Sequence, residues 1–270
     1  MPTIYFVTHP MNEPHYGWKL GPVRVPWNTG KNHFRKFIKR KGKYLNDIHK
    51  KMKEADLYFW GEYEPPTDCD FISRTTPKAI HHTLHPVRGR VCIPDNAINT
   101  DPYVFGNHFK NICCGIRKKN IEEVYKEDDV IIFGQIIGEK YFWFDTVLVI
   151  NKPIKINHTL NTTQYYNASI KPLIKARSKK NPCTRGNVRY FYQGKMFSEN
   201  THLYSFVPVS LNEHYEKKPI LDLDAFGTKI YKQGFLPRVS PVEFNQARWN
   251  KMLDAVKKAG LKIGIQIDKI

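Results

Sequence analysis

The sequence has few cysteines, and their spacing excludes the usual cysteine-based frameworks. None of them forms a CxxC pair, and their number is odd, so a disulfide framework is not expected and a reducing compartment is favoured. The histidines and cysteines are not at zinc-ligand spacings, so we expect no metal and no cofactor. The five cysteines are Cys69, Cys92, Cys113, Cys114 and Cys183.

Long apolar runs are also missing. No stretch approaches the roughly 18 consecutive apolar residues of a membrane-spanning helix. The segment Met1–Thr8 has no basic region before its apolar residues, so it reads as a first strand and not as a secretion signal. Hydrophobic residues make up 41% and aromatic residues 13% of the 270 residues, which is a globular composition. We therefore expect a single cytoplasmic domain without a membrane partner.

Acidic residues are scarce in two segments that hold nearly all of the excess positive charge. The segment 31–53 has ten Lys or Arg and one acid, Asp47, and the segment 146–198 has ten Lys or Arg and no acid. The net charge is +18, so the remainder of the chain is about neutral. Charge concentrated in this way is typical of a surface that binds phosphate groups, which predicts DNA or RNA as the partner. Solvated faces in a lysine-rich composition are the alternative.

The basic residues that we expect to contact phosphates come from both segments. They are Lys31, Arg35, Lys36, Lys39, Arg40, Lys43, Lys175, Arg177, Lys179, Lys180, Arg185 and Arg189.

The apolar spacing of the first basic segment predicts two helices. Residues 32–40 place Phe34, Phe37 and Ile38 on one side, and residues 45–54 do the same with Leu45, Ile48 and Met52. This predicts a basic helical insertion at about 31–55, with apolar stripes toward the domain and lysines toward solvent.

Several segments show the patterns of strands. Strands are predicted at 4–7, 57–64, 190–192 and 203–209. The runs 130–137 and 141–150 are apolar on both faces, which indicates central strands, and Gly138 between them indicates a hairpin. Asp145 interrupts the second run, so its carboxyl group must be hydrogen-bonded or functional.

The C-terminal segment 240–268 predicts a helix followed by a strand. Ser240 and Glu243 form a capping-box pattern with Pro241 at the first helical position, and Gly260 marks the end. The fold class expected is therefore α+β. It is a mixed, barrel-like sheet with a core at about 57–150, flanking basic helices and a C-terminal helix–strand unit.

The middle of the chain resembles a known family. The segments Asp101–Gly106, Cys113–Arg117 and Asp128–Gly134 are similar to the core of a PUA-like domain. They are most similar to the nucleotide-modification-associated domains grouped with the ASCH, EVE and YTH modules. The resemblance covers about residues 99–150 and implies a small β-barrel with a pocket for a base, often a modified one, displaced from its strand. Asp128 stands where the family usually has glycine.

Recognition of a displaced base requires aromatic side chains for stacking and polar groups for the base edge. The candidates for such a pocket are Trp60, Phe105, Asn107, His108 and Cys113. The leading prediction is a nucleic-acid-binding protein that recognises a base or modified nucleotide in a PUA-like pocket, with its basic helices on the phosphates.

Two alternatives stay open. A metal-dependent nuclease or base-processing hydrolase would need groups for acid–base work or for a divalent ion. Five residues have the right chemistry: Glu62, Glu64, Asp101, His108 and Asp145. The sequence has no HxE with a downstream CxxC, no GxxxxGK[ST] and no GxSxG to support that reading. The second alternative is a structural component of a ribonucleoprotein.

Overall fold

The computed structural model describes part of the chain. The described residues are 1–8, 35–46, 51–62, 69–70, 79–81, 85–86, 102, 104, 106, 109–111, 125–155, 190–215, 217–233 and 236–268. Within these ranges the protein is mostly β-sheet, with a short helix, α2 (Leu223–Phe226), and a longer helix, α3 (Gln246–Lys258). Neither helix is long and apolar enough to cross a membrane, and the same holds for every helix in these ranges.

The first sheet is mixed and has the order β15-β1-β8-β9-β10-β7, with β12 also pairing with β9. Its strands are β1 (Thr3–Thr8), β7 (Lys110–Asn111), β8 (Val130–Ile137), β9 (Tyr141–Lys155), β10 (Tyr190–Gly194), β12 (Ile220–Asp222) and β15 (Val242–Glu243). β1 and β8 are parallel, and the other neighbours are antiparallel. The predicted hairpin of β8 and β9 is confirmed, and Gly138 turns it with φ at +59°.

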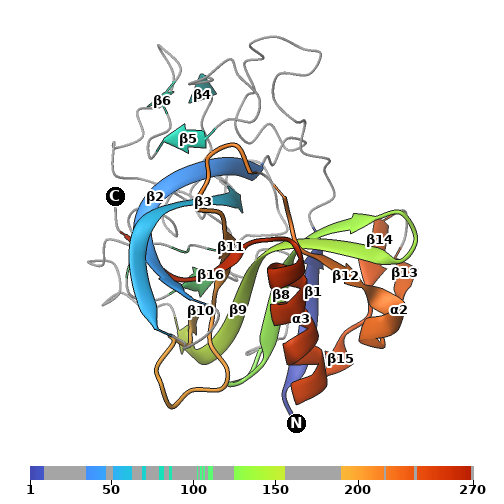
Figure 1. Cartoon of the computed structure of the whole chain (residues 1–270). Coiled ribbons are helices and arrows are strands. Elements are labelled where there is room, and N and C mark those ends of the chain that lie inside the picture. Colours follow the sequence, from blue (N-terminus) through green and yellow to red (C-terminus); the bar gives the residue numbers. More distant parts are fainter. Residues whose placement is uncertain are drawn as a thin grey trace.

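The second sheet has the order β11-β16-β2-β3, with β5 beside β2. Its strands are β2 (Arg35–Leu45), β3 (Met52–Glu62), β5 (Ala79–His81), β11 (Val207–Val209) and β16 (Lys262–Ile267). Two short pairs lie outside these sheets: β4 (Cys69–Asp70) with β6 (His85–Pro86), and β13 (Ile230–Gln233) with β14 (Leu236–Val239). Figure 1 shows β2 and β3 curling together into half of a barrel. The predicted mixed, barrel-like sheet is thus present.

The predicted basic helices at 32–40 and 45–54 are wrong where the structure describes them, and 32–34 and 47–50 lie outside the described residues. The structure has β2 and β3 in the described parts, paired antiparallel from Arg35 opposite Glu62 to Leu45 opposite Met52. The spacings of three and four residues that form one helix face divide the same apolar residues between the two faces of a strand. β2 gains backbone hydrogen bonds from β3 on one side and from β16 on the other, which a helix at this place would lose.

Residues 206–210, which we call the linking segment, join the two sheets. Phe206 exchanges both backbone hydrogen bonds with Val147 of β9, each at 2.9 Å. The next three residues form β11 and pair with β16. Ser210 then exchanges backbone hydrogen bonds with Tyr58 of β3, at 2.7 and 2.9 Å. Five consecutive residues therefore contact three strands and close the second sheet against the first.

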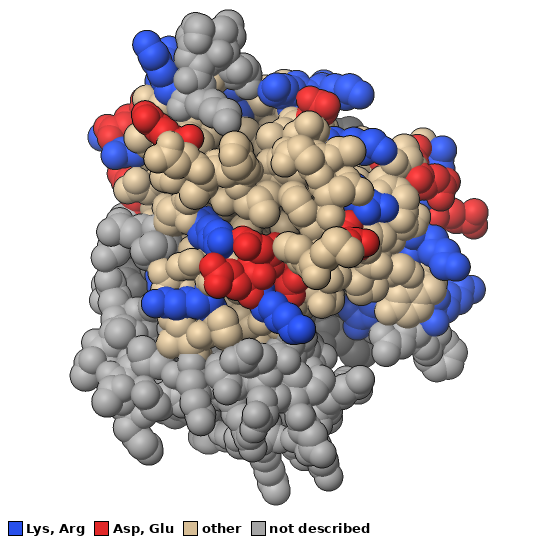
Figure 2. Space-filling view, turned by 90° about the horizontal axis from the view of Figure 1, so that it is seen from below, with Lys and Arg blue, Asp and Glu red and all other residues tan. Residues whose placement is uncertain are grey.

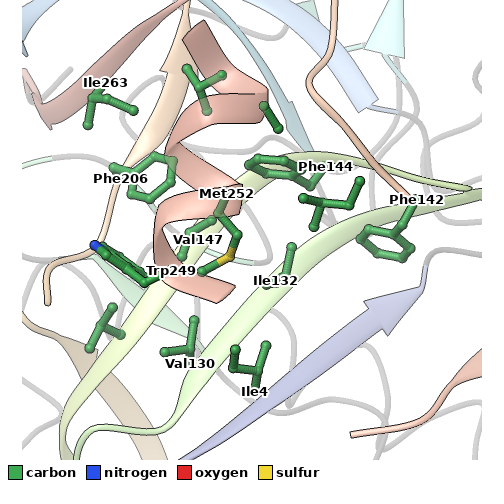
Figure 3. Close-up of a cluster of buried hydrophobic side chains, with 14 of the residues drawn as sticks. Ile4, Val130, Ile132, Phe142, Phe144, Val147, Phe206, Trp249, Met252 and Ile263 are labelled. Carbon is green, nitrogen blue, oxygen red and sulfur yellow. The ribbon is translucent and has the colours of Figure 1, made fainter. Parts of the chain in front are cut away.

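Two hydrophobic clusters lie on opposite faces of the first sheet. On one face α3 contributes Trp249 and Met252, which pack on Ile132, Phe144 and other core residues (Figure 3). The cluster on the other face fills the space toward the second sheet and includes Phe133, Leu148, Leu57 and Phe59. The arrangement is a helix, a sheet and a curled sheet in three layers.

The predicted C-terminal helix and strand are present as α3 and β16, but the helix begins later than expected. Its N-cap is Asn245, whose side chain accepts a hydrogen bond from the Arg248 amide at 2.8 Å. Pro241 is not the first helical residue, because Val242 and Glu243 pair with β1 as a strand. Pairing along the edge of β1 therefore prevents the capping box from forming.

Asp128, which stands where the resembling family has glycine, adopts the conformation that favours glycine. Its φ is +68°, and its carboxylate pairs with Lys195 at 2.5 Å. The buried carboxyl group of Asp129 accepts hydrogen bonds from the amides of Thr3 and Lys126, each at 2.8 Å. Asp129 thus holds the start of β1 against the turn before β8, which is a structural role.

Ser205 completes the backbone hydrogen bonding of β9 from a side chain. Its buried hydroxyl accepts from the Val149 amide at 3.0 Å and lies 3.3 Å from the Val149 carbonyl oxygen, to which it donates. We expect Ser205→Ala to lower the free energy of unfolding by about 1–3 kcal/mol, because a buried amide loses its acceptor. Urea denaturation measures this. Ser198→Ala, in an exposed turn, should change the free energy by less than about 0.5 kcal/mol, and an equal loss in both variants would contradict the assignment.

Tyr204 predicts a loss of stability at high pH. Burial against Trp249, Phe206 and Phe197 raises the pKa of Tyr204 from 10.0 to about 12. The unfolded chain loses this proton first, so stability falls as the pH rises from 10 to about 12, by up to roughly 3 kcal/mol. Tyr204→Phe should remove this part of the alkaline loss. Unfolding curves of both proteins across that pH range measure this difference. Parallel pH dependences of their free energies of unfolding would contradict the role of Tyr204.

Candidate nucleic-acid interface

Two aromatic side chains lie together on the outer face of β3. Tyr58 and Trp60 are two residues apart on the strand, so their side chains share a face. Each is 7% exposed, and the two form a buried cluster of their own, apart from the main core. The pairing of Tyr58 with Ser210 fixes this part of β3 beside the linking segment.

Lys218 brings Trp60 together with a tryptophan of the other sheet. Its Nζ lies 4.3 Å from the centre of the Trp60 ring and 6.0 Å from that of Trp143. A hydrogen bond from the Phe144 amide to the Pro219 carbonyl, at 3.1 Å, places the Lys218 segment against β9. We call Trp60, Trp143 and Lys218 the tryptophan–lysine cluster. A cation within about 6 Å of an indole is attracted by the negative face of the ring.

The lysines of β2 share the face of the hairpin that carries Tyr58 and Trp60 and alternate with inward residues. Lys39, Lys41 and Lys43 share the outer face of the hairpin by strand periodicity. Lys39 pairs with Asp56 at 2.8 Å, and its Nζ lies 5.6 Å from the centre of the Tyr58 ring. The hydrogen bond to Asp56, followed by that to Tyr58, raises the pKa of Lys39.

Lys43 pairs with Glu54 of the facing strand at 3.5 Å, with side chains that are 35% and 75% exposed. Exposed ion pairs of this kind contribute about 0–1 kcal/mol, so an incoming phosphate can replace the carboxylate at small cost. Two of the predicted phosphate-binding lysines therefore lie on one surface, partly neutralised by acids that the sequence spacing did not reveal.

Arg40 does not belong to this outer surface. It is directly opposite the fully buried Leu57, and its Nε and Nη2 atoms are buried. Arg40 as a whole is half-buried, and its contact with a phosphate stays a prediction. The alternation of β2 turns its side chain to the inner face of the hairpin, while Lys39 and Lys41 point outward.

Asp145 lies at a bulge inside the fold. Phe133 is opposite Thr146 and Gly134 is opposite Phe144, so Asp145 is the extra residue of β9. Asp145 is 3% exposed, and its Oδ1 accepts a hydrogen bond from the Thr146 hydroxyl at 3.1 Å. A Cβ on Gly134 would lie 1.9 Å from the Trp143 carbonyl oxygen, so the bulge requires glycine. The expectation that Asp145 is hydrogen-bonded is confirmed.

The remaining predicted site residues are placed only in part. Arg35, Lys36 and Glu62 are at the far end of the β2–β3 hairpin, where the backbone alone is described. Thirteen candidates lie outside the described residues: Lys31, Glu64, Asp101, Phe105, Asn107, His108, Cys113, Lys175, Arg177, Lys179, Lys180, Arg185 and Arg189. Among the described residues no group of three or more His, Cys, Asp or Glu side chains could hold a metal ion.

Tyr58, Trp143 and Lys218 were not predicted from the sequence as site residues. Tyr58 could have been found, because it is two positions from Trp60 on a predicted strand. Trp143 lies in a predicted apolar run, and no sequence motif around Lys218 indicates a site.

On the face shown in Figure 2, Lys and Arg side chains are interspersed with Asp and Glu and with uncharged surface. The described part of that face carries no continuous field of positive charge.

Comparison with known proteins gives no relative. No protein-family model matches the chain, and neither curated proteins nor solved structures give a match.

The tryptophan–lysine cluster predicts an effect of Lys218 on tryptophan fluorescence. Lys218→Gln removes the ammonium from the Trp60 and Trp143 rings, so acrylamide should quench the intrinsic fluorescence more strongly than in the unaltered protein. Lys217→Gln is the matched control, because Lys217 lies over Tyr215, 5.3 Å from its ring centre, and makes the same change in charge. Equal quenching in the two variants would contradict the arrangement.

Proposed function

We propose that this protein binds nucleic acid and recognises a base in it, using a PUA-like barrel. Bases stack on the tryptophan–lysine cluster, and the outward lysines of β2 hold the phosphates. The observation that carries the proposal is the convergence of Trp60 from the second sheet and Trp143 from the first on one lysine.

Stacking surfaces next to cations are the usual components of sites for unpaired bases. Stacking of one base on an aromatic side chain contributes about 1–3 kcal/mol to the binding free energy. This holds for each kind of base, because every base has a π face. Phosphate contacts position the strand, and the base contacts supply the selectivity. Tyr58 lies between Lys39 and Trp60 on the hairpin face, so phosphate-binding and base-binding groups are neighbours.

The barrel-like second sheet supports the PUA-like assignment at the level of architecture. The turn at Asp128 supports it further, since its positive φ matches the glycine of the resembling family. The substitution of glycine by aspartate is thus accommodated by the backbone and by the ion pair with Lys195.

The proposal predicts salt-dependent binding that needs Trp60. Fluorescence anisotropy with labelled single- and double-stranded DNA and RNA should show affinity that falls linearly in a double-logarithmic salt plot. Trp60→Leu should lose about 1–3 kcal/mol of binding free energy, with the salt slope unchanged, because it removes stacking and no charge. Tyr231→Leu, at an exposed aromatic of β13, is the matched control and should bind as the unaltered protein does.

A second pair of substitutions tests the phosphate contacts. Glu54→Gln with Asp56→Asn releases Lys43 and Lys39 from their carboxylates, so affinity for every nucleic acid should rise and the salt dependence should steepen. Circular dichroism confirms folding of each variant. Absence of binding at low salt would overturn the proposal, and shortened or base-stripped ligand in the presence of magnesium would replace it with a hydrolase.

A further inference from the structure

The tryptophan–lysine cluster holds a positive charge over an indole in the protein itself. Lys218 is the chain's own cation in a setting made by two tryptophans from different sheets. Trp60 is only 7% exposed, and the neighbouring Tyr58 is equally buried, so both rings are shielded from bulk water. Cation–π attraction is stronger where water is excluded, so this setting favours a positive charge over a neutral group.

We infer that, if the proposed function holds, the base recognised by this cluster is one that carries a positive charge. The chemical class is a purine or pyrimidine alkylated on a ring nitrogen, which makes the ring cationic. Lys218 occupies the position of that base in the free protein and leaves it when the base enters.

The exchange of occupants explains why a charged base is favoured over a neutral one. When a neutral base displaces Lys218, the indoles lose a cation and gain only stacking. When a cationic base displaces it, the indoles keep a cation and gain stacking as well. The displaced ammonium is then free to pair with the phosphate of the same nucleotide, which is a charge-assisted contact.

The bulge of β9 adds the carboxyl group of Asp145 to the side of the strand that carries Trp143. Phe142, Phe144 and Val147 belong to the cluster under α3, so Trp143 lies on the opposite face of β9. Leu148 also belongs to that opposite face. The bulged Asp145 follows Trp143 by two residues, which puts a carboxyl group on the same strand as the indole that receives the base.

Two isomers of methyladenine separate charge from size. In 1-methyladenine the methyl group is on a ring nitrogen and the ring is protonated and cationic at neutral pH, whereas N6-methyladenine has the same heavy atoms and is neutral. We expect a single-stranded oligonucleotide with one 1-methyladenine to bind about three- to thirtyfold more tightly than the same oligonucleotide with N6-methyladenine, from the cation–π contribution. Anisotropy at fixed salt and pH 7 measures both.

Two variants test the role of Lys218. Displacing Lys218 costs the same for either base, so Lys218→Gln should change both affinities by the same factor and keep their ratio, whereas Lys217→Gln should leave both affinities unchanged. Trp60→Leu should abolish the preference while salt-dependent binding continues. Equal binding of the isomers, or preference for the neutral one, together with Trp60-dependent binding overturns this inference and leaves the proposed function intact. No binding of either oligonucleotide at low salt overturns both.

Discussion

The arrangement of this protein depends on the backbone hydrogen bonds of the linking segment. Phe206 bonds to β9 of the first sheet, Val207–Val209 to β16, and Ser210 to β3. This segment forms backbone hydrogen bonds with three strands one after another. Because its residues are consecutive, its register with one strand fixes its register with the other two. Phe206 and Val207 of this segment are fully buried. The Phe206 side chain belongs to the cluster under α3, and the Val207 side chain belongs to the cluster between the two sheets.

The candidate interface follows from the same connection. Ser210 holds Tyr58, and therefore its neighbour Trp60, at the seam between the sheets. The chain continues from there to Pro219, whose carbonyl oxygen bonds to the Phe144 amide, so Lys218 is placed between the two tryptophans by bonds on both sides. No residue of the cluster is adjacent in sequence to another. Their proximity is a property of the way the sheets are joined.

Part of the sheet could be predicted from the sequence, because short runs that are apolar on both faces and bounded by turn residues are typical of central strands. The runs that form β8 and β9 and the glycine turn between them were predicted for this reason, and the final helix and strand were predicted from their helical and alternating apolar spacing. The basic segment was predicted to be helical because Phe34, Phe37 and Ile38 have the i, i+3, i+4 spacing of one helix face, and this local spacing does not exclude a strand. Only pairing with β16 and β3 decides between them, and β16 is more than two hundred residues away.

The candidate site was predictable only where its residues lie on a recognisable strand. Trp60 was found in this way, and Lys39 and Lys43 were found from their charge. Trp143 and Lys218 owe their position to contacts between distant segments, and the carboxylates that pair with the lysines come from the facing strand. The inward direction of Arg40 follows from strand alternation, which the helical assignment concealed.

The position of β1 has a consequence for the order in which the chain can fold during synthesis. β1 precedes both of its neighbours by more than a hundred residues, since β8 begins at Val130 and β15 at Val242. During synthesis both edges of β1 therefore stay unpaired until β8 has emerged, and one edge stays unpaired until β15 has emerged. Such long-range pairing slows folding and exposes edges to other chains. In a shortened form that lacks β15, one edge of β1 has no partner strand. Aggregation during translation should therefore limit the yield of such forms.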